Sequence, residues 1–284
     1  MVDVVYRFGV DPEDGERRPA TADRAQQLLE AGNRDFSGLF DPDRDPASPA
    51  TITVAAGDLG WGAGPGGILA HEPFAAVVGC ADARVPIELV FGRAVNDLFV
   101  LRVAGNVLGA EVIGSLDYAF QNLPTLRLMV VLGHSSCGAV TAAVDAYLNP
   151  ASYLGLSAEH QLRAIVDQLF PAIRLGHAAM LRNWGAEAAS RPGFVPALVD
   201  TSIALNAAIM ASSLRSELAS YGLTEVAPRF GVYDLASHAV GTPAEGSEGG
   251  RLVGLSEPPS DAEGFTALAD AYTRGPVVAA AMGA

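Results

Sequence analysis

Short runs of consecutive apolar residues alternate with longer amphipathic stretches from residue 74 onward. Such runs are too short for typical helices and are characteristic of strands buried on both faces of a sheet. We predict strands at 74–79, 98–103, 127–133 and 229–235, and helices at 110–122, 139–148, 158–184 and 196–221. The alternation indicates an α/β fold class with a mostly parallel central sheet flanked by helices.

The N-terminal part has a different pattern. Residues 1–20 are largely polar and are expected to form a polar N-terminal tail. Residues 21–36 have apolar positions at helical spacing, which predicts a helix. Thr21 is its expected N-cap, and Gly32 indicates an end or a local break of that helix.

Two segments rich in glycine and proline precede the first predicted strand. Residues 41–50 are typical of a loop, and residues 57–67 are dense in glycine after a strand-like run at 51–56. Residues 62–67 match G-x-G-x-x-G literally, which raises the alternative of a dinucleotide-binding module. That motif requires a long helix next, but another predicted strand follows instead. A flexible loop is the interpretation that we favour.

Residues 21–241 therefore form the expected α/β domain. Residues 242–284 begin with a linker-like composition and contain a short apolar stretch. We expect this C-terminal extension to pack on the body of the domain or on a partner subunit.

The 284-residue chain is 50% hydrophobic and 18% charged, so it can bury a sizeable core. Its net charge of −14 disfavours nucleic acid as a partner. All 18 basic residues are arginine, which excludes a catalytic lysine and a Walker-type phosphate loop. We find neither a secretory signal nor an apolar run approaching 18 residues, and we expect a cytoplasmic protein without a membrane span.

The only two cysteines each follow a predicted strand. Cys80 lies in GCADARVP, with Asp82 two residues later, and Cys137 lies in GHSSCGAV, with His134 three residues earlier. Carboxyl ends of parallel strands are where such sheets place functional side chains. Two thiolates, one imidazole and one carboxylate suit Zn²⁺.

Asp82 determines whether such a site is open. If Asp82 binds the metal, the site is closed; if it does not, a water takes the fourth position, as catalytic zinc requires. Arg84 lies two residues further on, so both side chains leave the same face of an extended segment. An arginine–carboxylate pair would hold Asp82 away from the metal and direct it toward a bound hydroxide.

Each half of this constellation has an ordinary explanation. A single buried cysteine is usually a small hydrophobic residue, and His-x-x-Cys alone is weak evidence for a metal. The combination of both pairs at strand ends favours zinc. The remaining helical or strand-end histidines, His160, His177 and His238, have no paired ligand nearby and are interpreted as structural or solvated.

Four separated blocks, CADARVP, FVLRVAGN, GSLDYAF and GHSSCGAV, occur in the order found in β-class carbonic anhydrases, and the chain resembles that family. The shared motifs are Cys-x-Asp-x-Arg and His-x-x-Cys-Gly. AQQLLEAGNRDF resembles the family's N-terminal helix, and RFGVYDLASHAVG resembles its last strand. The resemblance covers about residues 20–241.

The resemblance implies a zinc ion held by Cys80, His134 and Cys137, with Asp82 as a further ligand in a closed state. It assigns Asp82 and Arg84 as the catalytic dyad. The implied reaction is the reversible hydration of CO₂ to bicarbonate and a proton by zinc hydroxide.

The resemblance also implies a small substrate pocket and an oligomer. Phe99 and Tyr118 match aromatic residues that line the CO₂ pocket, partly from the partner chain, and Gly138 matches the glycine beside the metal. The N-terminal helix is expected to act as an arm that embraces a second subunit, so a homodimer or homotetramer is implied.

The sequence departs from the family pattern at two positions. His71 stands where the family usually has a glutamine that donates to substrate oxygen; a neutral imidazole has one N–H to donate, and it can also shuttle protons. Val77 stands where a bacterial subgroup has a tryptophan of an inhibitory bicarbonate site. We therefore expect no such regulation, although Arg102 matches that subgroup's arginine.

Two alternatives within the same fold remain. The zinc site can hydrolyse COS or CS₂ by the same attack on a linear carbon. A closed site, or one filled by His71, would leave a catalytically silent zinc protein acting as a scaffold or bicarbonate sensor.

Overall fold

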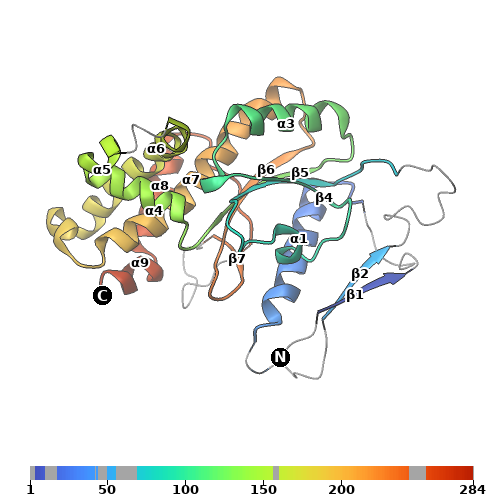
Figure 1. Ribbon diagram of the computed structural model, residues 1–284, viewed down its shortest axis with the longest axis horizontal. Coiled ribbons are helices and arrows are strands. Elements are labelled where there is room, and N and C mark those ends of the chain that lie inside the picture. The colour runs from blue at the N-terminus through green and yellow to red at the C-terminus, as the bar shows by residue number, and fades with distance from the viewer. Residues whose placement is uncertain are drawn as a thin grey trace.

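A computed structural model describes residues 4–9, 18–41, 43, 50–55, 69–155, 160–242 and 254–283. At its centre is a five-stranded sheet with strand order β4-β3-β5-β6-β7 (Figure 1). These strands are β3 (Ala75–Gly79), β4 (Leu98–Arg102), β5 (Leu128–His134), β6 (Ala227–Tyr233) and β7 (Val240–Gly241). The first four pair in parallel and β7 is antiparallel, which confirms the predicted fold class.

The central strands β3 and β5 are buried at every position, as their uninterrupted apolar sequences predict. Alternate residues of β3 contribute to different cores. Ala75 and Val77 belong to the core beneath helix α1, whereas Ala76 and Val78 belong to the core beneath helices α3 and α7. Figure 1 shows α1 and α3 on opposite sides of the sheet.

The predicted helices are present with small shifts at their ends. They are α1 (Ala22–Gly38), α3 (Ala110–Asn122), α4 (Gly138–Leu148), α6 (His160–Trp184) and α7 (Phe194–Ser220). Short helices α2 (Ile87–Val90) and α5 (Pro150–Gly155) were not predicted, because single helical turns leave too little periodic pattern.

Helix α7 forms the core of the molecule. Among the described residues it is the one helix long and apolar enough to cross a membrane by length and composition. However, 78% of its most apolar 18-residue stretch is buried inside the protein. The helix packs on β5, β6 and α6. Its apolar surface is thus accounted for by the core that it forms with the sheet.

Helix α1 begins as predicted, since the Thr21 side chain accepts a hydrogen bond from the Arg24 backbone N–H at 3.2 Å. The prediction that Gly32 ends or breaks this helix is wrong. Gly32 is buried in the middle of α1, where an added Cβ would lie 1.8 Å from the backbone oxygen of Phe91. The glycine is required because the helix crosses directly over the turn that follows α2.

The C-terminal extension packs on the body of the domain, one of the two predicted alternatives. It contains two helices that were not predicted, α8 (Ala262–Arg274) and α9 (Pro276–Ala281). The Asn183 side chain of α6 donates to Asp270 at 3.0 Å and to Thr273 at 2.7 Å, and the Trp184 indole N–H donates to the Thr273 backbone oxygen at 2.7 Å. These contacts fix α8 against the end of α6.

The N-terminal segment also differs from its prediction as a polar tail. It contains strand β1 (Val4–Gly9), which pairs in parallel with β2 (Ala50–Ala55) to form a separate two-stranded sheet. Strand β1 has the mostly apolar sequence VVYRFG, but it is short and an acidic, proline-containing stretch follows it, which obscures the signal. The G-x-G-x-x-G match at 62–67 and most of the predicted loop at 41–50 lie outside the described residues.

We predict that Gly32→Ala lowers the free energy of unfolding by about 2–3 kcal/mol, because the methyl group and the Phe91 carbonyl cannot occupy the same space. Urea denaturation followed by circular dichroism measures this change. Gly38→Ala is the matched control in the same helix, since no atom lies within 4 Å of its added Cβ. An equal effect of both substitutions would contradict the close helix crossing.

Candidate metal centre

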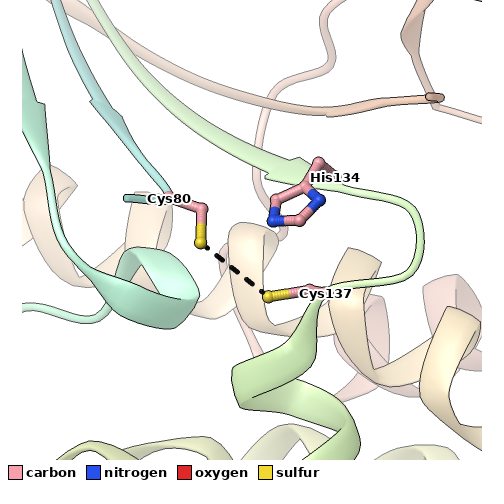
Figure 2. A group of neighbouring side chains, drawn as sticks. All are labelled: Cys80, His134 and Cys137. Atoms are coloured by element: carbon pink, nitrogen blue, oxygen red, sulfur yellow. Dashed lines mark hydrogen bonds between the residues drawn. The ribbon is translucent and has the colours of Figure 1, made fainter. Parts of the chain in front are cut away.

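Three side chains capable of binding a metal meet at the carboxyl ends of β3 and β5. Cys80 directly follows β3, His134 is the last residue of β5, and Cys137 is the N-cap of α4. Their ligand atoms all lie within 4.8 Å of one another, and the two Sγ atoms are 4.0 Å apart (Figure 2). All three side chains are buried. Among the described residues, this is the one group of three or more such side chains close enough to hold an ion.

The turn between His134 and Cys137 returns the chain to the centre. Ser136 adopts a positive φ of 57°, an uncommon conformation for a residue with a side chain. The turn is held by Ser135, whose backbone N–H donates to the Tyr233 oxygen at 2.9 Å and whose hydroxyl donates to Asp234 at 2.9 Å. Asp234 follows β6, so a third strand end supports the loop that presents two of the three ligands.

The imidazole of His134 is oriented for a metal. Its Nδ1 lies 3.0 Å from the Ser135 backbone oxygen, which can only accept, so Nδ1 carries the hydrogen. Its Nε2 therefore has a free lone pair, faces the two sulfur atoms in Figure 2, and has no hydrogen-bond partner among the described residues although the side chain is fully buried. A buried acceptor without a partner is costly, and a metal ion at the centre satisfies it.

A single hydrogen bond links the two thiol groups, so one proton lies between their sulfur atoms. The hydrogen bond from Cys137 lowers the pKa of Cys80 to about 4 against the opposing effect of burial, and donating that bond, together with burial, raises the pKa of Cys137. Backbone N–H groups of Ala139 and Val140, at the start of α4, act in the opposite direction and favour the Cys137 thiolate. A divalent cation would displace the shared proton and stabilise both thiolates. The donor set, the spacing and the free Nε2 thus fit a Zn²⁺ ion.

Asp82 and Arg84 form a bidentate ion pair beside this centre. Arg84 Nε donates to Asp82 Oδ1 at 2.9 Å, its terminal nitrogen donates to Oδ2 at 2.6 Å, and its backbone N–H donates to Oδ1 at 2.9 Å. The hydrogen bonds from Arg84 hold the pKa of the Asp82 carboxyl well below its usual range. Asp82 Oδ2 lies 3.9 Å from His134 Nε2, so the carboxylate borders the centre while it is engaged by the arginine.

Arg102 supports the same loop from β4. Its Nε donates to the Cys80 backbone oxygen at 3.0 Å, and its terminal nitrogen donates to the Asp82 backbone oxygen at 2.5 Å. In this structure Arg102 therefore braces the segment that carries the first ligand and the dyad aspartate. This role could not be predicted from the sequence, because hydrogen bonds to backbone carbonyl groups leave no motif.

The predicted pocket residues divide into two groups. Gly138 follows Cys137 and begins α4, next to the centre, with no atom within 4 Å of an added Cβ. His71 and Phe99 lie together, with ring centroids 5.9 Å apart, but at the amino-terminal end of β3 and β4, opposite to the end that carries Cys80. Tyr118 is on α3 and is 53% exposed. The chain thus does not bring these three residues to its own metal centre.

These features define an α/β protein with a buried Cys₂His centre at the carboxyl ends of adjacent parallel strands. Residues 75–204 match the family model described as carbonic anhydrase, and this span contains all three candidate ligands and the dyad. By this match and by two mycobacterial relatives, the part of the chain that carries the candidate centre is similar to carbonic anhydrases.

Two mycobacterial proteins are among its relatives. Carbonic anhydrase 2 of Mycobacterium tuberculosis is 42% identical over 106 residues, which are 37% of this chain and 48% of the relative. A carbonic anhydrase of Mycolicibacterium smegmatis is 42% identical over 112 residues, 39% of this chain and 52% of the relative. The chain therefore spans about half the length of the relatives that it matches.

Among solved structures, the β-carbonic anhydrase CcaA shares 21% sequence identity with this chain. The superposition covers 64% of this chain and 84% of CcaA, with a TM-score of 0.48.

We predict that the protein binds one zinc ion per chain and that His134→Ala abolishes stoichiometric binding, because the centre then retains only two ligands. Metal content after dialysis, measured by plasma mass spectrometry, checks this. His71→Ala is the matched control, since His71 is exposed and lies at the opposite end of β3. Retention of zinc by His134→Ala would show that the metal binds elsewhere.

Proposed function

We propose that this chain holds Zn²⁺ at Cys80, His134 and Cys137 and catalyses the reversible hydration of CO₂ to bicarbonate. The observation that supports this most strongly is the free, buried Nε2 of His134 facing two cysteine sulfur atoms. Similarity to proteins named carbonic anhydrase supports the reaction class. When bound, Zn²⁺ acts as a Lewis acid that acidifies a water in an open coordination position, to a pKa of about 7 in the carbonic anhydrase for which this is best known.

Asp82 supplies the orienting group in this proposal. Its carboxylate borders the centre, and both of its oxygens accept hydrogen bonds from Arg84. An ionised carboxylate accepts a further hydrogen bond and so fixes the direction of a nucleophilic oxygen. Because Arg84 keeps the pKa of Asp82 low, Asp82 stays ionised at neutral pH and does not retain the proton that hydration releases.

The substrate pocket of this proposal is built from two copies of the chain. His71, Phe99 and Tyr118 lie away from the centre of their own chain, and His71 and Tyr118 are exposed. A second copy arranged so that its His71 and Tyr118 face this chain's Cys80–Arg84 loop would complete the pocket. Helix α1 is the proposed contact arm of that dimer.

Stopped-flow CO₂ hydration at pH 8.5 on the zinc-loaded protein tests the function. We expect rapid hydration that is lost in Cys137→Ser, and a fall in kcat of about 10–100-fold in Asp82→Asn, which still binds zinc but accepts fewer hydrogen bonds. A zinc-loaded protein without hydration above buffer would refute the proposal. If that same protein then hydrolysed CS₂, the result would indicate that the site acts on another linear substrate.

Mixed oligomers test the shared pocket. The double variant His71→Ala/Tyr118→Ala keeps its metal ligands, and Cys137→Ser keeps its pocket residues. If the site is shared, co-refolding these two impaired proteins restores activity, because one intact centre then faces one intact set of pocket residues. Activity no higher than that of the two proteins refolded separately would place the pocket within a single chain.

A further inference from the structure

A cavity of about 1230 Å³ lies against the loop that carries two of the metal ligands. Arg84, Ser135 and Ser136 form the part of its wall next to the centre. Helix α7 contributes Asp200 and Thr201, and the C-terminal extension contributes Tyr272 and the residues that follow α8. The cavity is therefore completed by a segment outside the part of the chain that matches the family model.

Three polar groups on this wall have no partner among the described residues. The carboxylate of Asp200 has neither a hydrogen bond nor an ion pair in the part of the chain that the structure describes. The hydroxyls of Thr201 and Tyr272 are likewise unpaired there, although these residues are 0% and 8% exposed. Buried polar groups without protein partners are normally hydrogen-bonded to water, and this cavity has room for several water molecules.

The other ionisable groups that face this cavity are already engaged or exposed. Burial alone would raise the pKa of Asp234, but hydrogen bonds from the Ser237 side chain and backbone and from Ser135 lower it overall. Arg84 is paired with Asp82, and burial raises the pKa of Tyr272 so that it stays neutral. Arg34, Asp41 and Asp43 are exposed lining residues. Asp200 is thus the half-buried carboxylate in this wall that has no hydrogen bond to the described residues and can accept a proton.

We propose that Asp200 is the acceptor of the proton that CO₂ hydration releases, reached through water in this cavity with the Thr201 and Tyr272 hydroxyls as hydrogen-bonding supports. This inference rests on the proposed function. In the step, an O–H bond of water at the centre breaks, one proton passes along hydrogen-bonded water, and an O–H bond forms on the Asp200 carboxylate. A buffer base then removes the proton and restores the carboxylate.

The surroundings of Asp200 suit this role. Burial, and secondarily the negative charge of Asp234, raise its pKa to about 6. A carboxyl with that pKa accepts a proton from an acid of pKa near 7 and returns it to buffer at neutral pH without a large barrier in either direction. Asp82, in contrast, is held ionised by Arg84 and is unsuited to retain a proton.

Exchange of ¹⁸O between CO₂ and water, followed by mass spectrometry on the zinc-loaded protein, separates two rates. One is the interconversion of CO₂ and bicarbonate, and the other is the proton-dependent release of labelled water. We expect Asp200→Asn to lower the water-release rate by about 10²-fold, to change interconversion by less than about threefold, and to recover water release with added imidazole. Asp43→Asn, an exposed carboxylate of the same wall, should leave both rates unchanged.

A second measurement does not depend on activity. A carboxyl with a raised pKa in the folded state destabilises that state as pH rises through about 6, because its charge is then partly desolvated. The metal-free Asp200→Asn protein should therefore gain Tm over wild type, and the gain should grow from pH 5 to pH 8. Asp43→Asn should show no such trend.

The possible results have distinct meanings. Unchanged water release in Asp200→Asn, with normal interconversion, overturns the role of Asp200 and leaves the proposed function standing. A pH-independent difference in Tm overturns it as well, since the carboxylate would then be solvated. Absence of interconversion in wild-type protein refutes the proposed function and this inference together. If Asp200→Asn does not fold, Thr201→Val, which removes one hydroxyl at constant shape, should still lower the water-release rate.

Discussion

The parallel pairing of β3 with β5 is the constraint on which the candidate metal centre depends. Gly79 pairs with Leu132, so Cys80 and His134 leave the same edge of the sheet within one residue of each other. A slip of one residue would turn every side chain of a strand to the opposite face and separate the sulfur from the imidazole. The alternating contacts of β3 with the cores beneath α1 and beneath α3 oppose such a slip, so the packing of both faces protects the geometry of the centre.

Elements with a strong periodic pattern could be predicted from the sequence, and elements held by distant contacts could not. The four main strands and five main helices follow from apolar runs and amphipathic spacing, and the proximity of Cys80 to Cys137 follows from their places after two strands. Gly32 was misinterpreted because its reason is a carbonyl about sixty residues away, in the turn after α2. Helices α8 and α9 escaped notice because glycine and proline beside them suggested a linker.

Within the site, residue type and spacing identified the groups with characteristic chemistry but not those that work through backbone contacts. Asp82 and Arg84 are only two residues apart, so their ion pair could be predicted from the sequence. Arg102 donates a hydrogen bond to the backbone oxygen of Cys80, and the Ser135 hydroxyl donates to Asp234 at the end of β6. Only folding brings these partners close, because they are distant in the sequence. Asp234 could have been predicted as a site residue, because it directly follows β6 at the same edge of the sheet. Asp200 lies in α7, whose sequence is mostly apolar because most of the helix is buried. No motif near Asp200 in the sequence indicates a function.

Both cysteines of the 284-residue sequence lie in the candidate metal centre, which leaves no other thiol in it. Any reaction of this chain with a thiol reagent therefore reports on the centre alone, free of the background that surface cysteines give in most proteins. The absorption bands that thiolates give with cobalt or cadmium would likewise have a single origin. The chain thus carries its own spectroscopic reporter, and the occupancy of its centre can be followed during folding, assembly or turnover without attaching a label.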